Sequence, residues 1–407
     1  MHQIPAWLHR AYLLLFALLP WSFEYSFGTW TLDVPAEPLT AVVGIGLIFP
    51  VMQSMPYWRA GWKHHLPVAA GALWLCWMAV CAACSAIPLV SWKYWLVEAG
   101  HWWVFAAGAA LFPATWRAGM KLFGLSMTGM VVYTLLHHAT YHFRPDQALL
   151  APMPFFPENT LYAAVLAMIV FDAATARNRR RFLLPVFLTG LFFSFSVGAW
   201  LSIMLAVPIG LVFLFRKKWR SFLFAGVAVC LALASFRHVI FEKLAPAWRQ
   251  SVSVQERLNR YSCAFRMTQV RPWTGFGPGT FQFCYFPYQR TEEMTRISLT
   301  EPIAGRSPDT FGRGGGVHSE YWQAMSETGV PGLMLFLVLA ASILTTVFRR
   351  AWQAEGRHDR LLALAFALGL LSFFLHGTAN NFMHDGRIAA LVWGMAIAAG
   401  RENGDNG

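Results

Sequence analysis

Apolar runs, most of about 17–22 residues, recur along this chain, and a helix of this length can cross a hydrocarbon core of about 30 Å. They lie near residues 7–23, 38–56, 66–87, 95–113, 120–141, 159–176, 182–198, 199–215, 221–238, 329–348, 361–379 and 387–400. Of the 407 residues, 57% are hydrophobic and only 13% are charged, about half the charged fraction of an average soluble domain. We therefore expect an all-α polytopic membrane protein with about twelve transmembrane helices.

The apolar stretch 182–215 is too long for one crossing. A turn around Gly198 would divide it into a hairpin of two short helices. Clusters of Lys and Arg flank the hairpin on both sides, at Arg177–Arg181 and Arg216–Arg220, which places both of its ends in the cytoplasm.

The same positive bias predicts the organisation of the whole chain. Helices 1–9 are expected over 1–238, a large periplasmic loop with short helices over 239–328, helices 10–12 over 329–400, and a cytoplasmic tail over 401–407. Both termini are then cytoplasmic. The net charge of +12 is accounted for by topology and anionic headgroups, so no nucleic-acid partner is expected.

The arginines of the loop 239–328 need another explanation, because a loop of this length crosses the membrane regardless of its charge. A mixed helical pattern over 242–269 places Arg257, Arg260 and Arg266 roughly on one face. Guanidinium groups bind phosphate oxygens in pairs. Two interpretations remain open, a site for a lipid pyrophosphate and a basic face against ordinary phospholipid.

His318 stands just before the next predicted span, close to Glu320 and preceded by a glycine-rich strip that contains Arg313. A histidine at a membrane mouth can accept a proton from a sugar hydroxyl, because its pKa lies near neutral. The alternative is an ordinary interfacial histidine. A further polar group at the end of the eleventh span is expected to line the same cavity: His376, Asn380, Asn381 and His384.

Three other sequence patterns do not predict a catalytic or metal site. Gly275-x-Gly277-x-Gly279 contains Pro278 and lacks a preceding strand, so a structural turn is favoured over a dinucleotide site. Neither Cys81-x-x-Cys84 nor the pair His138 and His142 has the further ligands that a metal needs. We expect no metal and no cofactor. Two reduced thiols at Cys263 and Cys284 are favoured over a disulfide.

Two motifs in the long loop resemble those of the O-antigen ligase and polymerase superfamily of bacterial membrane glycosyltransferases. The first is an Arg, an aromatic four residues later and a P-x-x-G-x-G-x-G-x-F turn: Arg257, Tyr261, Pro272, Gly275, Gly277, Gly279 and Phe281. The second is a His followed by E-x-G-x-x-G: His318, Glu327, Gly329 and Gly332. The basic-flanked hairpin is similar as well. One position departs from the family pattern, because Ser196-Val197-Gly198 stands where Ser-Arg-Gly is common.

The resemblance implies a metal-independent, inverting transfer of a glycan from undecaprenyl pyrophosphate to an acceptor hydroxyl at the periplasmic face of the inner membrane. By this analogy His318 helps to activate the acceptor and Arg257 binds the pyrophosphate leaving group. Residues expected to bind the substrates are Arg260, Arg266, Arg313, Glu320 and Tyr261. The acceptor is lipid A-core in a ligase and a growing glycan in a polymerase.

Two other classes compete with this prediction. A polysaccharide or lipid transporter or flippase is compatible with twelve spans, but the chain shows no paired halves with matching broken helices. A peptidoglycan polymerase of the shape and division family uses similar donors, yet it is expected to rely on an outward acidic residue. The His-Glu-Gly pattern fits that family less well.

Overall fold

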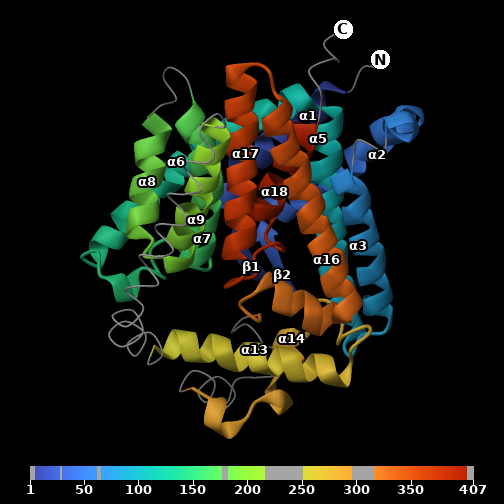
Figure 1. Cartoon of the computed structure of the whole chain (residues 1–407), viewed down its shortest axis with the longest axis vertical. Coiled ribbons are helices and arrows are strands. Elements are labelled where there is room, and N and C mark those ends of the chain that lie inside the picture. The colour runs from blue at the N-terminus through green and yellow to red at the C-terminus, as the bar shows by residue number, and fades with distance from the viewer. Residues whose placement is uncertain are drawn as a thin grey trace.

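The computed structural model describes residues 5–27, 30–61, 66–176, 182–215, 251–295 and 316–400. Long helices run side by side along the vertical axis in Figure 1, and α13 (Val252–Val270) lies across their lower end. The first part of the chain forms α1 (Ala6–Leu18), α2 (Ala36–Gly61), α3 (Leu66–Ala83), α4 (Pro88–His101), α5 (Gly108–Leu111), α6 (Pro113–Thr140), α7 (Asn159–Thr175), α8 (Leu183–Phe193) and α9 (Val197–Leu214). The later helices are α14 (Phe281–Cys284), α16 (Glu320–Gln353), α17 (Arg357–His376) and α18 (Gly386–Gly400). A π-helical segment, Trp102–Ala107, joins α4 to α5.

Within the described ranges, six helices are long and apolar enough to cross a membrane: α2, α3, α6, α9, α16 and α17. Shorter apolar helices coincide with α7, α8 and α18. Helices occupy every predicted span except 221–238, which lies outside the described residues. The helical membrane fold is therefore confirmed, while the number of twelve crossings stays a prediction.

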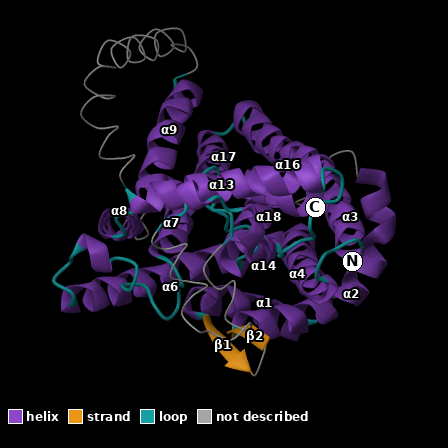
Figure 2. Ribbon diagram, turned by 90° about the horizontal axis from the view of Figure 1, so that it is seen from below, coloured by secondary structure: helices purple, strands orange, loops and turns teal. Residues whose placement is uncertain are grey.

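The prediction of an all-α chain is wrong in one short region. Residues Phe23–Phe27 and Trp30–Val34 form an antiparallel two-stranded ribbon, β1 and β2, in which Phe23 pairs with Val34 and Tyr25 with Leu32. Aromatic and β-branched residues alternate with polar ones here, a pattern of period two that favours a strand. Figure 2 shows the ribbon at the edge of the bundle, beside α1.

The predicted hairpin at 182–215 is confirmed. Its helices, α8 and α9, are joined at Ser194–Ser196, just before the expected position of the turn. Ser196 is the N-cap of α9, because its side chain accepts a hydrogen bond from the backbone N–H of Ala199. The turn therefore lies where capping chemistry is available, and Gly198 falls in the first turn of α9.

The centre of the bundle is α7. Its residues from Leu161 to Phe171 are all buried, and it packs against α17, α8 and α9. Since the segment is apolar all round, it can bury every face against protein rather than lipid. α17 packs on α7, α9 and α16, so the C-terminal helices share this interior.

α13 differs from the bundle helices in composition. Its buried residues recur three or four apart, at Glu256, Asn259, Arg260, Cys263, Ala264 and Met267. Together with Phe276, Phe281, Tyr285 and Val317 its apolar members form a second, smaller core. The thiols of Cys263 and Cys284 are free. α13 is thus a packed cover over one end of the bundle, in contact with α16.

Helices α1 and α18 both extend away from this covered end. Leu19, after the end of α1, and Gly386, at the start of α18, line the same cavity beside α13. α1 therefore begins, and α18 ends, at the opposite end of the bundle (Figure 1). The positions of both termini on the cytoplasmic side, and of the loop on the periplasmic side, stay predictions.

Candidate functional site

The two sequence motifs interlock to form one structural unit. The Glu327 carboxylate accepts hydrogen bonds from the backbone N–H groups of Gly279, at 2.8 Å, and Phe281, at 3.0 Å. The backbone N–H of Gly277 donates to the Glu327 carbonyl oxygen at 2.9 Å. The glycine turn therefore depends on a single buried glutamate about fifty residues later in the chain.

Glycine is required at two positions of this unit. Gly277 has φ of 107°, and a β-carbon there would lie 2.1 Å from Ser85 Oγ. Gly329 has φ of 74° and interrupts α16, and its β-carbon would lie 2.1 Å from the carbonyl oxygen of Trp273. Both residues combine a left-handed backbone with close contact to another segment. The predicted structural turn is confirmed at Gly275, Gly277 and Gly279, which all have positive φ.

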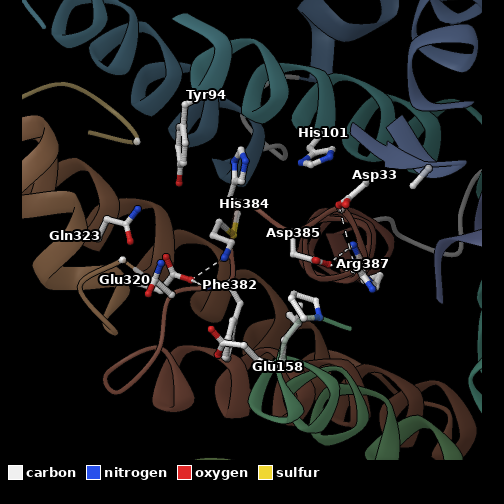
Figure 3. Close-up of a pocket in the computed structure, with 18 of the residues that line it drawn as sticks. Asp33, Tyr94, His101, Glu158, Glu320, Gln323, Phe382, His384, Asp385 and Arg387 are labelled. Atoms are coloured by element: carbon white, nitrogen blue, oxygen red, sulfur yellow. Dashed lines mark hydrogen bonds and ion pairs between the residues drawn. The ribbon is translucent and has the colours of Figure 1, made fainter. Parts of the chain in front are cut away.

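A cavity of about 330 Å³ opens where this unit meets the ends of α1, α4 and α18 (Figure 3). Its described lining includes six acidic residues and one arginine: Asp33, Glu37, Glu158, Glu320, Glu327, Asp385 and Arg387. His101, His318 and His384 line it too, as do Asn381 and Gln323. The cavity is therefore rich in hydrogen-bond acceptors, which suits a neutral, hydroxyl-bearing ligand better than an anion.

Arg387 is held by the wall of the cavity and is not free for a ligand. Its Nε lies 2.9 Å from Asp385 Oδ1 and its Nη2 lies 3.9 Å from Asp33 Oδ2. Burial raises the pKa of Asp33, and the nearby Asp385 raises it further while Arg387 lowers it. This ion-pair group joins β2 to the start of α18 (Figure 3).

His318 has a strained backbone that hydrogen bonds from two other segments hold in place. Its φ of 59° is in the left-handed region, which is uncommon for a residue with a side chain. Its backbone N–H donates to Asn381 Oδ1 at 3.1 Å, and its carbonyl oxygen accepts from the Tyr261 hydroxyl at 2.9 Å. Strain of this kind persists only where the surroundings fix it, and it clusters at functional sites.

The environment of His318 keeps its ring neutral. Burial, together with the positive charges of Arg260 and Arg257, lowers the pKa of His318 to about 3. His318 thus stands at a boundary, with the acid-lined cavity on one side and the arginines of α13 on the other. A neutral imidazole can both donate and accept a hydrogen bond.

The three arginines of α13 do not form the expected common basic face. Arg260 is 1% exposed, pairs with Glu256 at 2.9 Å and donates to the Gly316 carbonyl oxygen at 3.0 Å. Arg266 pairs with Glu293 and donates to the carbonyl oxygen of Tyr288. Along a helix, positions 257 and 266 are about half a turn apart, since each residue turns the helix by about 100°.

Arg257 has a different environment. It is half-buried, and its Nε has no hydrogen-bond partner among the described residues. Its charge acts on Tyr261, His318 and His376. His376 is 2% exposed with both ring nitrogens unpartnered within the described residues, and it lies against Gly198 at the tip of the α8–α9 hairpin.

The remaining predicted residues have structural contacts. The Tyr261 hydroxyl also approaches the Thr378 carbonyl oxygen, at 3.2 Å, and Glu320 accepts hydrogen bonds from the backbone N–H groups of Phe382 and Met383. Tyr261 thereby joins α13, and Glu320 joins α16, to the loop after α17. Asn381 and His384 line the cavity with His318, as expected, whereas His376 and Asn380 are not among its lining residues. Arg313 lies outside the described residues.

Four further residues that line the cavity around His384 were not singled out from the sequence: Asp33, Tyr94, Asp385 and Arg387. His384 lies between Tyr94 and His101 (Figure 3), with its ring stacked on Tyr94 at 4.1 Å. Its Nδ1 is 3.4 Å from Glu98 Oε1. Asp33, Asp385 and Arg387 complete the group. The sequence offered one signal for them, which is that they are charged or polar residues at the ends of apolar spans. Such residues are costly to bury without a partner.

No three His, Cys, Asp or Glu side chains in the described ranges lie together as ligands for a metal ion. The carboxylates of the cavity instead have backbone N–H groups or Arg387 as partners, as at Glu320, Glu327 and Asp385.

The comparison with protein families agrees with this geometry. Residues 182–337 match the family described as O-antigen ligase. The matched range contains the α8–α9 hairpin, α13, the glycine turn, His318 and the Glu327–Gly329 segment. No curated protein matches the chain. The resemblance to the O-antigen ligase and polymerase superfamily that the sequence motifs predicted is therefore confirmed over residues 182–337.

Proposed function

We propose that this protein moves a glycan from undecaprenyl pyrophosphate to an acceptor hydroxyl at the periplasmic face of the inner membrane. The observation that carries the proposal is the position of His318, between an acid-lined cavity and the unpartnered side of Arg257. A glycan transferase needs these two environments next to each other, one for hydroxyls and one for phosphates.

The two sides select different parts of the substrates. Six carboxylates would repel a pyrophosphate but accept hydrogen bonds from sugar hydroxyls. Arg257 is half-buried and its buried Nε has no partner among the described residues, so its guanidinium has hydrogen-bonding capacity left for phosphate oxygens and for the charge that develops on the leaving group. Arg260 and Arg266 support this side indirectly, since both already have carboxylate partners.

Val197, which stands where an arginine is common in the family, is consistent with the same division of the site into a hydroxyl-binding and a phosphate-binding side. Val197 is 58% exposed at the start of α9, while His376 fills the space beside Gly198. An arginine at position 197 would place a second guanidinium near this tip. In its absence, the pyrophosphate site depends more strongly on Arg257 than is usual in the superfamily.

The central experiment replaces His318 by Ala in the full-length protein and measures undecaprenyl pyrophosphate released from a lipid-linked glycan. We expect at least a 100-fold loss of transfer with normal membrane insertion. His358→Ala is the matched control, because His358 is exposed at the start of α17, the end remote from the cavity. Full activity of His318→Ala would refute the proposed site.

The lipopolysaccharide of a deletion strain separates the two acceptors. Loss of every capped band indicates a ligase that uses lipid A-core. Core with one repeat indicates a polymerase, and an unchanged ladder indicates a different polymer or a transporter.

A further inference from the structure

We propose that His384, paired with Glu98, is the group that takes the proton from the acceptor hydroxyl. The inference rests on the proposed glycan transfer and assigns a second histidine to it. His318 then serves as a neutral hydrogen-bonding group next to Arg257 on the donor side.

The geometry of His384 is that of an oriented base. Its Nδ1 lies 3.4 Å from Glu98 Oε1, so the carboxylate favours a proton on Nδ1, and in the neutral ring the lone pair is then on Nε2. No partner of Nε2 occurs in the described part of the chain, and the side chain is 44% exposed in the cavity. Stacking on Tyr94 at 4.1 Å fixes the plane of the ring.

The charges around the ring support the assignment. Groups that face His384 come from five elements: Glu37, Glu98, His101, Asp33, Asp385, Glu320 and Glu327. Burial lowers the pKa of His384, but the hydrogen bond and charge of Glu98, with Glu37 and Asp385, raise it above its ordinary value. Its base strength therefore exceeds that of His318, whose pKa is lowered to about 3.

The proposed step is balanced within the chemistry already named. The acceptor oxygen forms the new bond to the anomeric carbon while its proton passes to Nε2 of His384. The bond from that carbon to the pyrophosphate oxygen breaks, and its electron pair stays on the pyrophosphate, next to Arg257. Glu98 stabilises the imidazolium that results.

The experiment measures the pH dependence of undecaprenyl pyrophosphate release by the full-length protein in nanodiscs. A base must be neutral to act, so wild-type kcat should fall as the pH drops through the raised pKa of His384, above 6.5. His384→Gln should lower kcat by about 100-fold or more and remove this acid limb. Glu98→Gln should move the limb to lower pH by about one unit or more, because the charge that raises the pKa is gone.

Controls make each outcome informative. His358→Gln, at the opposite end of α17, should leave rate and profile unchanged. If His384→Gln fails to fold, the isosteric Glu98→Gln variant still decides, since an unshifted limb in that variant overturns the proposal. The proposal is also overturned if His384→Gln and Glu98→Gln both keep the wild-type rate and the wild-type acid limb of the pH profile. Release that is absent from the wild-type protein itself would instead refute the proposed glycan transfer.

Discussion

The acid-lined cavity and the α13 side of His318 carry opposite charges. The carboxylates of the cavity come from several elements, whereas the arginines come from one helix. Carboxylates of the cavity come from β2, α2, α16 and the loops before α7 and α18, and most are tied to backbone N–H groups or Arg387. On the other side, one helix supplies all three arginines, and two of them are paired. The comparison teaches that a count of charged residues does not locate a binding group. A polar atom without a partner within the protein is the better guide to such a group.

The largest effect that tests this contrast is expected at Arg257. Arg257→Ala should lower glycan transfer by about 100-fold, since it removes the guanidinium that stabilises the leaving pyrophosphate. The measurement is release of undecaprenyl pyrophosphate at saturating acceptor. Arg144→Gln is the matched control, because Arg144 is an exposed arginine paired only with Asp146. A variant as active as this control would show that the donor binds elsewhere.

Arg260 should affect stability before it affects the substrates. Arg260→Ala removes the guanidinium that lies 2.9 Å from the buried Glu256 carboxylate, and breaking such a buried pair costs about 3–5 kcal/mol. We expect a clearly lower Tm of the detergent-solubilised protein. The double variant with Glu256→Ala should recover part of that loss. If Tm is unchanged while the donor KM rises, Arg260 binds substrate directly.

On the acidic side, Glu37→Gln should raise the acceptor KM by about ten-fold, the worth of one charged hydrogen bond. The donor KM should stay the same. This split between the two substrates distinguishes an acceptor cavity from a mixed site. A rise in both constants would contradict the division of the site by charge.

The smallest effect on activity is expected from Tyr261, which holds His318 at the boundary between the acid-lined cavity and the arginines of α13. Tyr261→Phe removes the hydroxyl that donates to the His318 carbonyl oxygen, a bond worth about 1 kcal/mol. We expect kcat to fall about five-fold with both KM values nearly unchanged. Tyr25→Phe, on the exposed strand β1, is the control. No change in kcat would mean that Asn381 alone holds His318.

Much of the fold could be predicted because the sequence pattern expresses it locally. Apolar length predicted the bundle helices, and the excess length of 182–215 predicted α8 and α9. The strands β1 and β2 were missed because they are short and follow directly on an apolar helix, where an aromatic-rich end is typical of a membrane interface. The kink of α16 at Gly329 coincides with the predicted start of that span.

The candidate site was predicted in part. His318 and Asn381 were expected in one cavity and are found in it. His384 was named only as a neighbour, because its partner Glu98 is almost 300 residues earlier and no spacing rule links them. Likewise, approximate periodicity placed Arg257 and Arg266 on one face, whereas they lie about half a turn apart and only Arg266 pairs with Glu293 among the described residues.

The sequence by itself determined that this chain is a helical membrane protein and that residues 182–337 resemble the O-antigen ligase family, because hydropathy and motif order are properties of neighbouring residues. Only the tertiary structure decided which charged groups are used within the protein and which remain available. Glu327 caps the glycine turn, Arg260 pairs with Glu256, and the buried Nε of Arg257 has no partner among the described residues. The physical reason is that the cost of burying a charge depends on its partner, and partners are brought together by packing rather than by spacing along the chain.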